Sequence, residues 1–374
     1  MNDKQALEQL RSQIDALDSE IVSLLNKRAL IAQEIGEVKT RLKLPIYRPE
    51  RENEVLSKVC AKSEGPLTDQ ALVAIWREVM SACRSLELTI KVAYLGPRGT
   101  FSEQAMVRQF GSTVEGIPCA TIEQVFKKIS GEEAAFGIVP IENSTEGSVN
   151  RTMDCLLKTD LFIVGECSIP VHQNLMTKSG TLEGIERVYS HPQSLGQCVL
   201  WLNQNLPRVE RIAVASNGEA ARLASEEPGA AAIAGERAGE IFGLKKVAAS
   251  IQDSSGNRTR FVILSKNPSA ASEAYEKDKT SLIFSLPHRA GSLYHALKPF
   301  DDYGISMTRF ESRPAKSGTW EYFFYTDIEG NANDPKVKQA LEAFRAGCSS
   351  LKNLGSYPAE ADFSSPIDLK GSKL

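Results

Sequence analysis

Cationic side chains interrupt an apolar stripe near the N-terminus of the sequence. Between Leu7 and Val38, apolar residues recur at alternating spacings of three and four, which predicts one long helix with a heptad seam, and Arg28 occupies one position of that seam. Stripping water from an unpaired guanidinium costs several kcal/mol, so Arg28 requires an anionic partner. Lys39 follows eleven residues later, about 20° away on the same helix face. The two cations predict a pocket for a small anion.

Charged residues of the next two predicted helices extend this pocket. Arg51 and Glu52 lie near the start of the second helix, and Glu87 follows Cys83 by four residues on the apolar stripe of the third. Arg11 lies roughly 50–100° away from the cationic face of the first helix, so we expect it to serve a neighbouring chain. The alternative is that the heptad is only an oligomerisation seam, in which a polar residue fixes the register.

In the middle of the chain, short apolar runs are each followed by a polar turn. Four such turns cover residues 96–102, 140–147, 190–193 and 216–218. In open α/β sheets these turns gather at the carboxyl ends of the strands, where free helix N–H groups and the helix dipole favour anions. A further run, Asn257-Arg258-Thr259-Arg260-Phe261, places two cations and a hydroxyl at the start of an apolar strand. We therefore expect this segment to bind a small carboxylate ligand.

Three kinds of scaffold are needed to position these residues. Residues 1–90 show helical periodicity only, and three helices cannot enclose a core alone, so we expect an intertwined dimer. Residues 91–267 alternate short strands with helices, which predicts an α/β domain. After a polar linker, residues 279–356 show the order βαββαβ, which is typical of a ferredoxin-like module. The sequence thus predicts a multidomain protein of α and α/β class.

Composition narrows the class of protein. The 374 residues are 42% hydrophobic and 24% charged, as in ordinary soluble proteins of two to three domains, and a net charge of −3 disfavours nucleic acid or a membrane as a partner. The seven cysteines are scattered and no apolar leader precedes the first helix, so we expect a reduced, cytoplasmic protein. The four histidines lack metal-ligand spacing, and no apolar run could span a bilayer. We expect neither a metal enzyme nor a membrane protein.

Four motifs, in order along the chain, carry a resemblance to a known family. They are Pro-Ile-Glu-Asn at 140–143, Ser-His-Pro-Gln at 190–193, Asn-Arg-Thr-Arg-Phe at 257–261 and Glu-Ser-Arg-Pro at 311–314. With these motifs, nearly the whole chain resembles the bifunctional chorismate mutase–prephenate dehydratases of phenylalanine biosynthesis. The resemblance implies an all-helical mutase domain, a two-lobed dehydratase domain similar to periplasmic binding proteins, and a C-terminal ACT regulatory domain. It implies no cofactor.

By this resemblance, the helical domain rearranges chorismate to prephenate. The expected pocket comprises Arg11 from the other chain, Arg28, Lys39, Arg48, Arg51, Glu52, Cys83 and Glu87. Chorismate is a dianion that rearranges within itself, so the pocket must hold it compactly and stabilise the ether oxygen as that atom gains negative charge. Lys39 and a protonated Glu87 would donate to this oxygen, while arginines bind the carboxylates. Arg48 and Glu87 depart from the family pattern, which has an acid and commonly a glutamine there.

The resemblance also implies that the middle domain converts prephenate to phenylpyruvate with loss of carbon dioxide and the ring hydroxyl. Thr259 would act as the donor near the leaving hydroxyl, and Arg258 or Arg260 would hold a carboxylate. Motif matches place five further residues in the cleft: Glu142, Asn143, Ser190, His191 and Gln197. The group that finally delivers the proton stays open.

The terminal module is expected to bind L-phenylalanine as a feedback inhibitor. A turn before its first helix offers free N–H groups to a carboxylate, and residues 311–314 match the family's effector motif. The expected effector residues are Ala290, Gly291, Ser292, Leu293, Glu311, Ser312, Arg313 and Pro314. The partners expected are therefore chorismate, prephenate, L-phenylalanine and further copies of the chain, as a homodimer or higher oligomer.

Two other functions fit parts of the same pattern. The first is a cytoplasmic, non-catalytic regulator that binds an amino acid through the binding-protein-like fold and the ACT domain. The second is a dehydratase whose helical domain only dimerises, which the departure at Arg48 would favour. Adding chorismate to the protein and following prephenate and phenylpyruvate separately distinguishes these possibilities.

Overall fold

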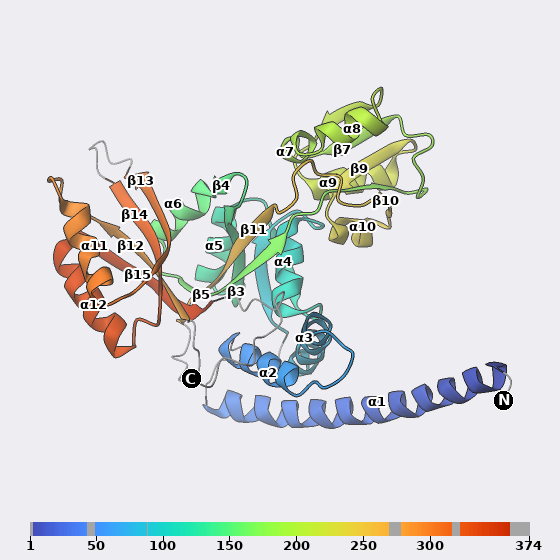
Figure 1. The fold of residues 1–374 in the computed structure, drawn as a ribbon, viewed down its shortest axis with the longest axis horizontal. Helices are drawn as coiled ribbons and strands as arrows, with labels where there is room; N and C mark the ends of the chain where they lie inside the picture. The colour runs from blue at the N-terminus through green and yellow to red at the C-terminus, as the bar shows by residue number, and fades with distance from the viewer. Residues whose placement is uncertain (1–2, 43–48, 88, 269–277, 316–321, 360–374) are drawn as a thin grey trace. The chain divides into compact units, whose positions relative to one another are not determined.

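In the computed structural model, the chain divides into two compact units (Figure 1). The structure describes residues 3–42, 49–87, 89–268, 278–315 and 322–359. One unit contains residues 1–90 together with 110–115, and the other contains residues 91–109 and 116–362. Each unit is described by itself below.

Three helices form the first unit, as the helical periodicity predicts. They are α1 (Asp3–Leu42), α2 (Pro49–Ala61) and α3 (Asp69–Ser85). Thr68 caps α3, because its hydroxyl accepts a hydrogen bond from the Ala71 N–H at 3.3 Å. Helices α2 and α3 pack through a small cluster of buried side chains, namely Leu56, Cys60, Leu72, Val73 and Met80.

The apolar stripe of α1 is largely uncovered in the single chain. Leu10, Leu17 and Leu24 are 57%, 57% and 62% exposed, and Gly36 is the one buried residue of this helix among those described. A continuous apolar stripe of this length is unfavourable in water. The stripe therefore has the character of a surface that another helix covers.

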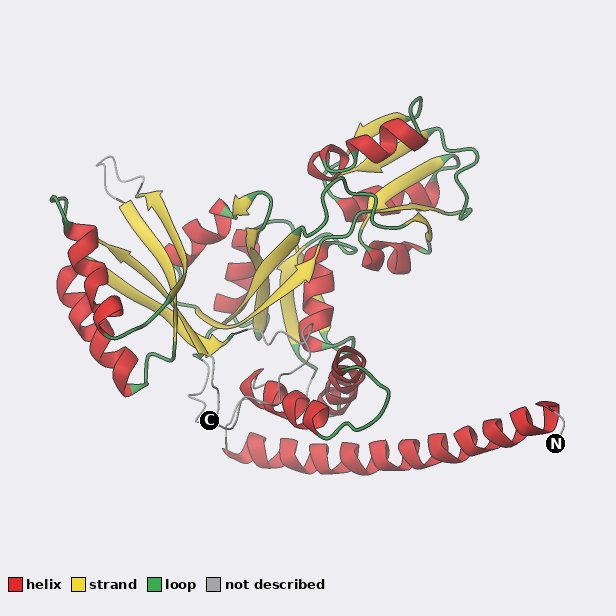
Figure 2. Cartoon of the chain, viewed as in Figure 1, coloured by secondary structure: helices red, strands yellow, loops and turns green. Residues whose placement is uncertain are grey.

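Two mixed sheets form the lobes of the dehydratase-like region (Figure 2). The first has the order β2-β1-β3-β11-β5, with β4 paired to β3, and the second has the order β10-β6-β9-β7-β8. Their strands are β1 (Lys91–Leu95), β2 (Glu115–Cys119), β3 (Phe136–Asn143), β4 (Gly147–Ser148), β5 (Phe162–Pro170), β6 (Asn174–Thr177), β7 (Arg187–Ser190), β8 (Glu210–Ala213), β9 (Ala230–Ala234), β10 (Lys245–Ala248) and β11 (Arg258–Ser265). The chain passes between the lobes after β5 and returns before β11.

Helices cover these sheets and begin near the predicted polar turns. Those of the first lobe are α4 (Phe101–Phe110), α5 (Ile122–Ser130) and α6 (Asn150–Lys158); those of the second are α7 (Pro192–Gly196), α8 (Val199–Asn205), α9 (Asn217–Glu226) and α10 (Glu236–Phe242). Ser216 caps α9 by accepting the Glu219 N–H at 3.1 Å. The N-terminal ends of α4 and α9, at residues 100–102 and 216–217, border one cavity between the lobes.

The C-terminal sheet is antiparallel with the order β13-β14-β12-β15, which confirms the predicted ferredoxin-like arrangement. Its elements are β12 (Asp278–Ser285), α11 (Ser292–Asp302), β13 (Met307–Pro314), β14 (Tyr322–Glu329), α12 (Pro335–Gly347) and β15 (Ser350–Pro358). One sheet face packs on α11 and α12. From the other face, Ile283, Tyr325, Leu354 and Tyr357 join the core of the first α/β lobe. The C-terminal sheet therefore packs against its own helices on one face and against the first lobe on the other.

Candidate active sites

A cavity of about 370 Å³ lies among the three helices of the first unit. Its lining brings together six predicted residues: Arg28, Lys39, Arg51, Glu52, Cys83 and Glu87. Arg11 is exposed on α1 and does not line this cavity within one chain, whereas Arg48 lies outside the described residues. Of these six residues, Arg28 and Lys39 were predicted from the helical period, whereas Cys83 was named as a site residue only by the resemblance.

The acid of this pocket is buried against the first helix. Only 7% of the Glu87 side chain is exposed, and its Oε2 lies 3.5 Å from Nζ of Lys39. The Arg28 guanidinium donates to the Cys83 sulfur at 3.0 Å. A β-carbon built on Gly36 would stand 2.7 Å from Cγ of Glu87, so the missing side chain on α1 is what admits this acid. Sequence reasoning missed Gly36.

Arg84 is a second residue of this pocket that sequence reasoning missed. Its side chain is 8% exposed, contacts the Glu52 carboxylate and donates to the Phe110 carbonyl. It therefore orients Glu52. Arg84 follows buried Met80 by four residues and therefore lies on the same face of α3. The apolar stripe predicted for this helix included only apolar residues, so Arg84 was left out.

A second cavity, of about 340 Å³, lies between the two dehydratase lobes. Its polar lining consists of hydroxyls, amides and one imidazole: Thr100, Ser102, Asn143, Gln173, His191, Gln193, Ser194, Gln197, Ser216, Asn217, Asn257 and Thr259. Among the lining residues that the structure describes, none is Arg, Lys, Asp or Glu. The first N–H groups of α4 and α9 supply the positive potential here.

The hydroxyl of Thr259 has a defined direction. Asn143 Nδ2 donates to Thr259 Oγ1 at 2.8 Å, and the two residues are paired across β3 and β11. The amide cannot be reversed without loss, because Asn143 Oδ1 accepts the N–H groups of Thr145 and Glu146 at 3.0 and 3.1 Å. Since Thr259 accepts from Asn143, its own proton remains available to a ligand.

Side chains of the second lobe form an amide network around Asn217. Asn217 Nδ2 donates to Ser194 Oγ at 2.9 Å, and Gln173 Nε2 donates to the same oxygen at 3.0 Å. Asn217 Oδ1 accepts from Ser190 Oγ and from the His191 N–H, both at 3.0 Å. Ser190 is fully buried and lies behind the lining, so it holds Asn217 instead of facing the cavity as predicted.

Gln197 and the missed residue Asn257 complete the lining. Gln197 Oε1 accepts from Asn257 Nδ2 at 3.3 Å and from Gln173 Nε2 at 3.4 Å. Within the described part of the chain, Gln197 Nε2 is buried without a hydrogen-bond partner. This amide group is therefore a donor left for a ligand.

Three predicted dehydratase residues are not brought to the cavity. Arg258 donates to Ser168, and the charged ends of Arg260 and Glu142 lie on the side of the sheet that faces the C-terminal sheet. The reason is the two-residue period of a strand. Because Thr259 and Asn143 face the cavity, their neighbours must face the other way.

The comparisons with known proteins agree with this division. Family models match at residues 10–88 (Chorismate mutase type II), 92–269 (Prephenate dehydratase) and 280–346 (ACT domain). A bifunctional chorismate mutase/prephenate dehydratase of Neisseria gonorrhoeae is 47% identical over 351 residues, covering 93% of this chain and 96% of that protein. The chain belongs to this bifunctional family. It therefore carries chorismate mutase and prephenate dehydratase activities.

Two solved structures are similar to the dehydratase and ACT regions of this family member. A prephenate dehydratase from Arthrobacter aurescens in complex with L-Phe has a TM-score of 0.67 at 32% identity, and the match covers 74% of this chain and 92% of that one. The structure of GqqA, described as a novel type of quorum quenching acylase, has the same TM-score at 28% identity, covering 74% of this chain and all of that one. Proteins described as having different activities thus share this fold.

In the ACT domain of this family member, the two predicted effector segments reach the same end of the sheet. Phe323 pairs with Ser285 on one side, just before the turn leading to Gly291, and with Arg313 on the other. The Arg313 guanidinium points to α6, where it contacts Asn150 and lies 2.9 Å from Asp154. Arg313 and Pro314 line a cavity of about 880 Å³ between α6 and the ACT sheet.

Metal and membrane features are not found in the part of the chain that the structure describes. No group of three His, Cys, Asp or Glu side chains there is arranged to hold a metal ion. Among its helices, none combines the length and apolar character of a membrane-spanning segment.

Proposed function

We propose that the helical pocket performs the mutase reaction by electrostatic preorganisation alone. The observation that supports this is the convergence of Arg28, Lys39 and Arg51 with the buried acid Glu87 around one cavity. The arginines bind the two carboxylates of chorismate and hold its side chain over the ring. Lys39 donates to the ether oxygen as the carbon–oxygen bond breaks, and Glu87 adds a second donor whenever its carboxyl group carries a proton. No nucleophile is required.

A second copy of the chain completes this pocket in our proposal. The exposed stripe of α1 includes Leu10, Leu17 and Leu24, and Arg11 lies on the same helix. Pairing two such helices buries the stripes and carries Arg11 of one chain toward the pocket of the other. Replacing Leu17 by Glu should give a monomer in sedimentation experiments and weaken the mutase. A Leu17→Glu protein that stays dimeric would contradict this arrangement.

The dehydratase cavity acts on prephenate through neutral donors. Helices α4 and α9 bind carboxylate groups at their N-termini, and Thr259 donates to the leaving ring hydroxyl. The electron pair of the carbon–carboxylate bond moves into the ring as carbon dioxide leaves, and the ring hydroxyl departs with the electron pair of its carbon–oxygen bond. One proton, supplied in the end by solvent, converts it to water. Aromatisation of the ring drives this step. Asn143 keeps the Thr259 proton directed at the substrate.

The ACT domain binds L-phenylalanine and inhibits the dehydratase in this proposal. Support comes from the related dehydratase solved with L-Phe and from the position of residues 290–293 and 311–314 at one end of the sheet. Coupling of about 1–3 kcal/mol is typical of such regulation. Titration calorimetry of the full chain with L-phenylalanine tests it, and a protein that neither binds this amino acid nor slows in its presence would refute it.

We also propose the cytoplasm as the location and a division into domains 1–90, 91–267 and 279–356. All seven cysteines are free thiols, which suits a reducing compartment. Burial raises the pKa of the Cys198 thiol to about 12, so this group stays protonated and unreactive at neutral pH. The three matched family models support the domain division.

Two substitutions test the assignment of the two sites. Arg28→Ala should abolish the conversion of chorismate to prephenate and spare the dehydratase, whereas Thr259→Ala should do the reverse. Lys27→Ala, at an exposed neighbouring cation, and Thr259→Ser, which keeps the hydroxyl, are the matched controls. Both reactions are assayed on every variant. Loss of both activities in a folded Arg28→Ala protein would rule out separate sites.

A further inference from the structure

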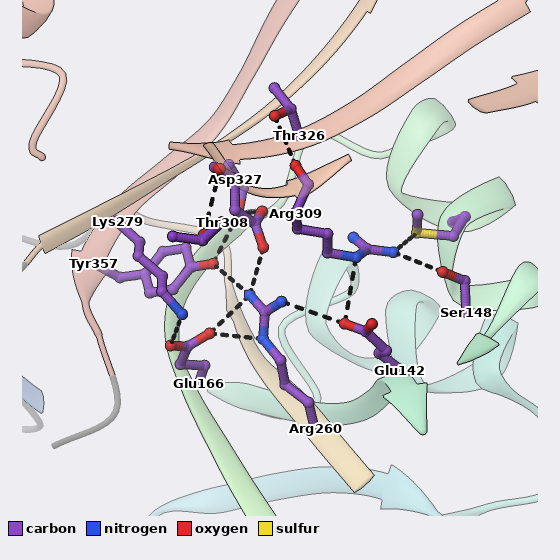
Figure 3. A network of polar contacts seen from close by, with 12 residues as sticks. Glu142, Ser148, Glu166, Arg260, Lys279, Thr308, Arg309, Thr326, Asp327 and Tyr357 are labelled. Carbon is purple, nitrogen blue, oxygen red and sulfur yellow. Dashed lines mark hydrogen bonds and ion pairs between the residues drawn. The ribbon is translucent and has the colours of Figure 1, made fainter. Parts of the chain in front are cut away.

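A cluster of ion pairs around Arg260 joins the dehydratase lobe to the ACT sheet (Figure 3). Arg260 Nε donates to Glu166 Oε2 at 2.8 Å, and Nη2 donates to Asp327 Oδ2 at 2.6 Å. The side chains of Glu166 and Asp327 are 3% exposed, and that of Arg260 is 17% exposed. Glu166 belongs to β5, whereas Asp327 belongs to β14 of the ACT domain.

A second ion-pair contact to the ACT sheet involves Glu142, which is on the neighbouring strand β3. Glu142 Oε2 lies 3.7 Å from Arg260 Nη1 and 3.6 Å from Nε of Arg309, which is on β13. Arg309 also donates to Ser148 Oγ at 3.1 Å. With Lys279, whose Nζ is 2.7 Å from Glu166, the cluster contains three cations and three carboxylates. Its formal charges cancel, and its most buried members are Glu166 and Asp327, whereas the Glu142 side chain is 42% exposed.

The cluster and the catalytic side chains share the same two strand ends. Thr259 pairs with Asn143 and Arg260 pairs with Glu142, so one pair faces the cavity and the next faces the ACT sheet. The ladder between β3 and β11 shifts its register directly after Arg260. A bulge interrupts the pairing with β3 at this point, while β5 still pairs with residues 258–260 on the other side. The ion pairs of Arg260 add a restraint from the ACT sheet on the side where the pairing with β3 is irregular.

Burial makes the restraint specific. A buried carboxylate that loses its partner is strongly destabilised, so Arg260 has one favourable position between Glu166 and Asp327. Ser281 Oγ donates to Asp327 Oδ1 at 2.6 Å, which fixes that carboxylate on the ACT side. Burial raises the pKa of the Tyr357 hydroxyl, which lies 3.4 Å from Arg260 and stays neutral.

We propose that Arg260 is a positioning residue for the dehydratase reaction, held from the ACT domain by Asp327 and fixing the strand ends that carry Thr259 and its orienting partner Asn143. The ACT sheet is then part of the catalytic scaffold, and a displacement of β14 reaches the substrate cavity through one side chain. This inference rests on the proposed role of Thr259. Arg260 itself does not touch the substrate.

Asp327→Asn in the full-length protein tests this inference. The amide keeps the size of the side chain but removes the charge that holds Arg260. We expect kcat of the dehydratase to fall about 10- to 100-fold, since small misplacements of reacting groups cost this much. KM for prephenate should change less than kcat, and the mutase rate in the same sample should stay unchanged. If Asp327→Asn does not fold, Arg260→Lys replaces it, because a lysine keeps the charge and loses the fork.

Lys352→Met is the matched control. Lys352 is a cation on β15 that donates to the Leu156 and Leu157 carbonyls of the dehydratase lobe at 3.1 and 3.3 Å, away from β3 and β11. Its loss should leave kcat near the native value. An equal fall of kcat in Lys352→Met would show that any weakening of the domain contact has this effect, and it would overturn the specific role of Arg260.

A double-variant cycle separates this inference from the role of Thr259. If Arg260 acts through Thr259, Asp327→Asn should cost little further activity when the residual dehydratase rate of Thr259→Ala is read from long incubations at high enzyme concentration. An undiminished, additive loss would overturn the positioning role. If Thr259→Ala is inactive and Asp327→Asn has native kcat, only the inference fails. If Thr259→Ala retains native activity, the proposed function of Thr259 fails first.

Discussion

The two pockets of this chain accept anions of similar size with opposite chemistry. The mutase pocket is lined by Arg28, Lys39 and Arg51, whereas the described lining of the dehydratase cavity contains amides, hydroxyls and one imidazole. The difference follows the charge that each reaction creates or removes. In the mutase, negative charge grows on an ether oxygen, and fixed cations stabilise it.

The dehydratase instead removes a charge from its substrate. The carboxylate that leaves becomes neutral carbon dioxide, so a tight ion pair to that group would stabilise the ground state more than the transition state. Amides such as Asn217 and Gln197 hold a substrate in place without this penalty. The comparison teaches that the number of cations around a site reflects the chemistry more than the charge of the ligand.

The largest expected effect comes from adding a side chain at Gly218, where the two dehydratase lobes approach each other closely. A β-carbon on Gly218 would lie 2.2 Å from the Arg98 carbonyl oxygen, which is backbone and cannot turn away. Gly218→Ala should therefore reduce the dehydratase by about 100-fold or more and leave the mutase intact. Gly196→Ala is the control, because nothing lies within 4 Å of its β-carbon position. Equal rates in native and Gly218→Ala proteins would contradict the cavity as the site.

A smaller effect is expected for the same substitution at the mutase pocket. In Gly36→Ala the new β-carbon meets the Glu87 side chain at 2.7 Å, and that side chain moves away from Lys39. We expect the mutase rate to fall about 10-fold, with the dehydratase unchanged. Gly65→Ala, in open space, is the control. A fully active Gly36→Ala enzyme would show that the position of Glu87 is unimportant.

A higher salt concentration should raise KM for chorismate a few-fold more than KM for prephenate. Raising the ionic strength from about 0.05 to about 0.5 M screens interactions between charges. KM for chorismate should therefore rise more than KM for prephenate, measured on one preparation with potassium chloride. Identical salt dependence of the two constants would remove the electrostatic contrast between the sites.

The last expected effect is a change of pH profile. A carboxylate only accepts hydrogen bonds, and Glu87 must be protonated to donate, whereas an amide donates at every pH. The mutase rate of Glu87→Gln divided by that of the native protein should rise between about pH 5 and 9. The dehydratase rates of the two proteins serve as the internal control. A ratio that stays constant over this range would exclude Glu87 as the donor.

The sequence predicted the mutase pocket better than the dehydratase cavity for a geometrical reason. A helical period places Arg28 and Lys39 on one face within a single element, so spacing alone is sufficient. Arg84 was missed because its burial depends on Glu52 and Phe110, which come from other segments. The Gly36 contact with Glu87 likewise needs two packed helices.

In the dehydratase, a motif match assigned neighbouring residues to one cleft. The two-residue period of β11 already forbids Arg258, Thr259 and Arg260 from facing the same side, and this rule was available from the sequence. Asn217 stood in a predicted polar turn, but its role depends on Ser194 and Gln173 from distant segments. Ser190 is buried behind it by the same packing.

The central claim is that one chain holds two independent sites acting in series, and a mixing experiment tests it most directly. Arg28→Ala and Thr259→Ala proteins are each supplied with chorismate, alone and as an equal mixture, and phenylpyruvate is followed over time. We predict none from either variant alone and sustained formation from the mixture, with prephenate passing through solution. A mixture that forms no phenylpyruvate, although both variants are folded, would contradict the two-site account.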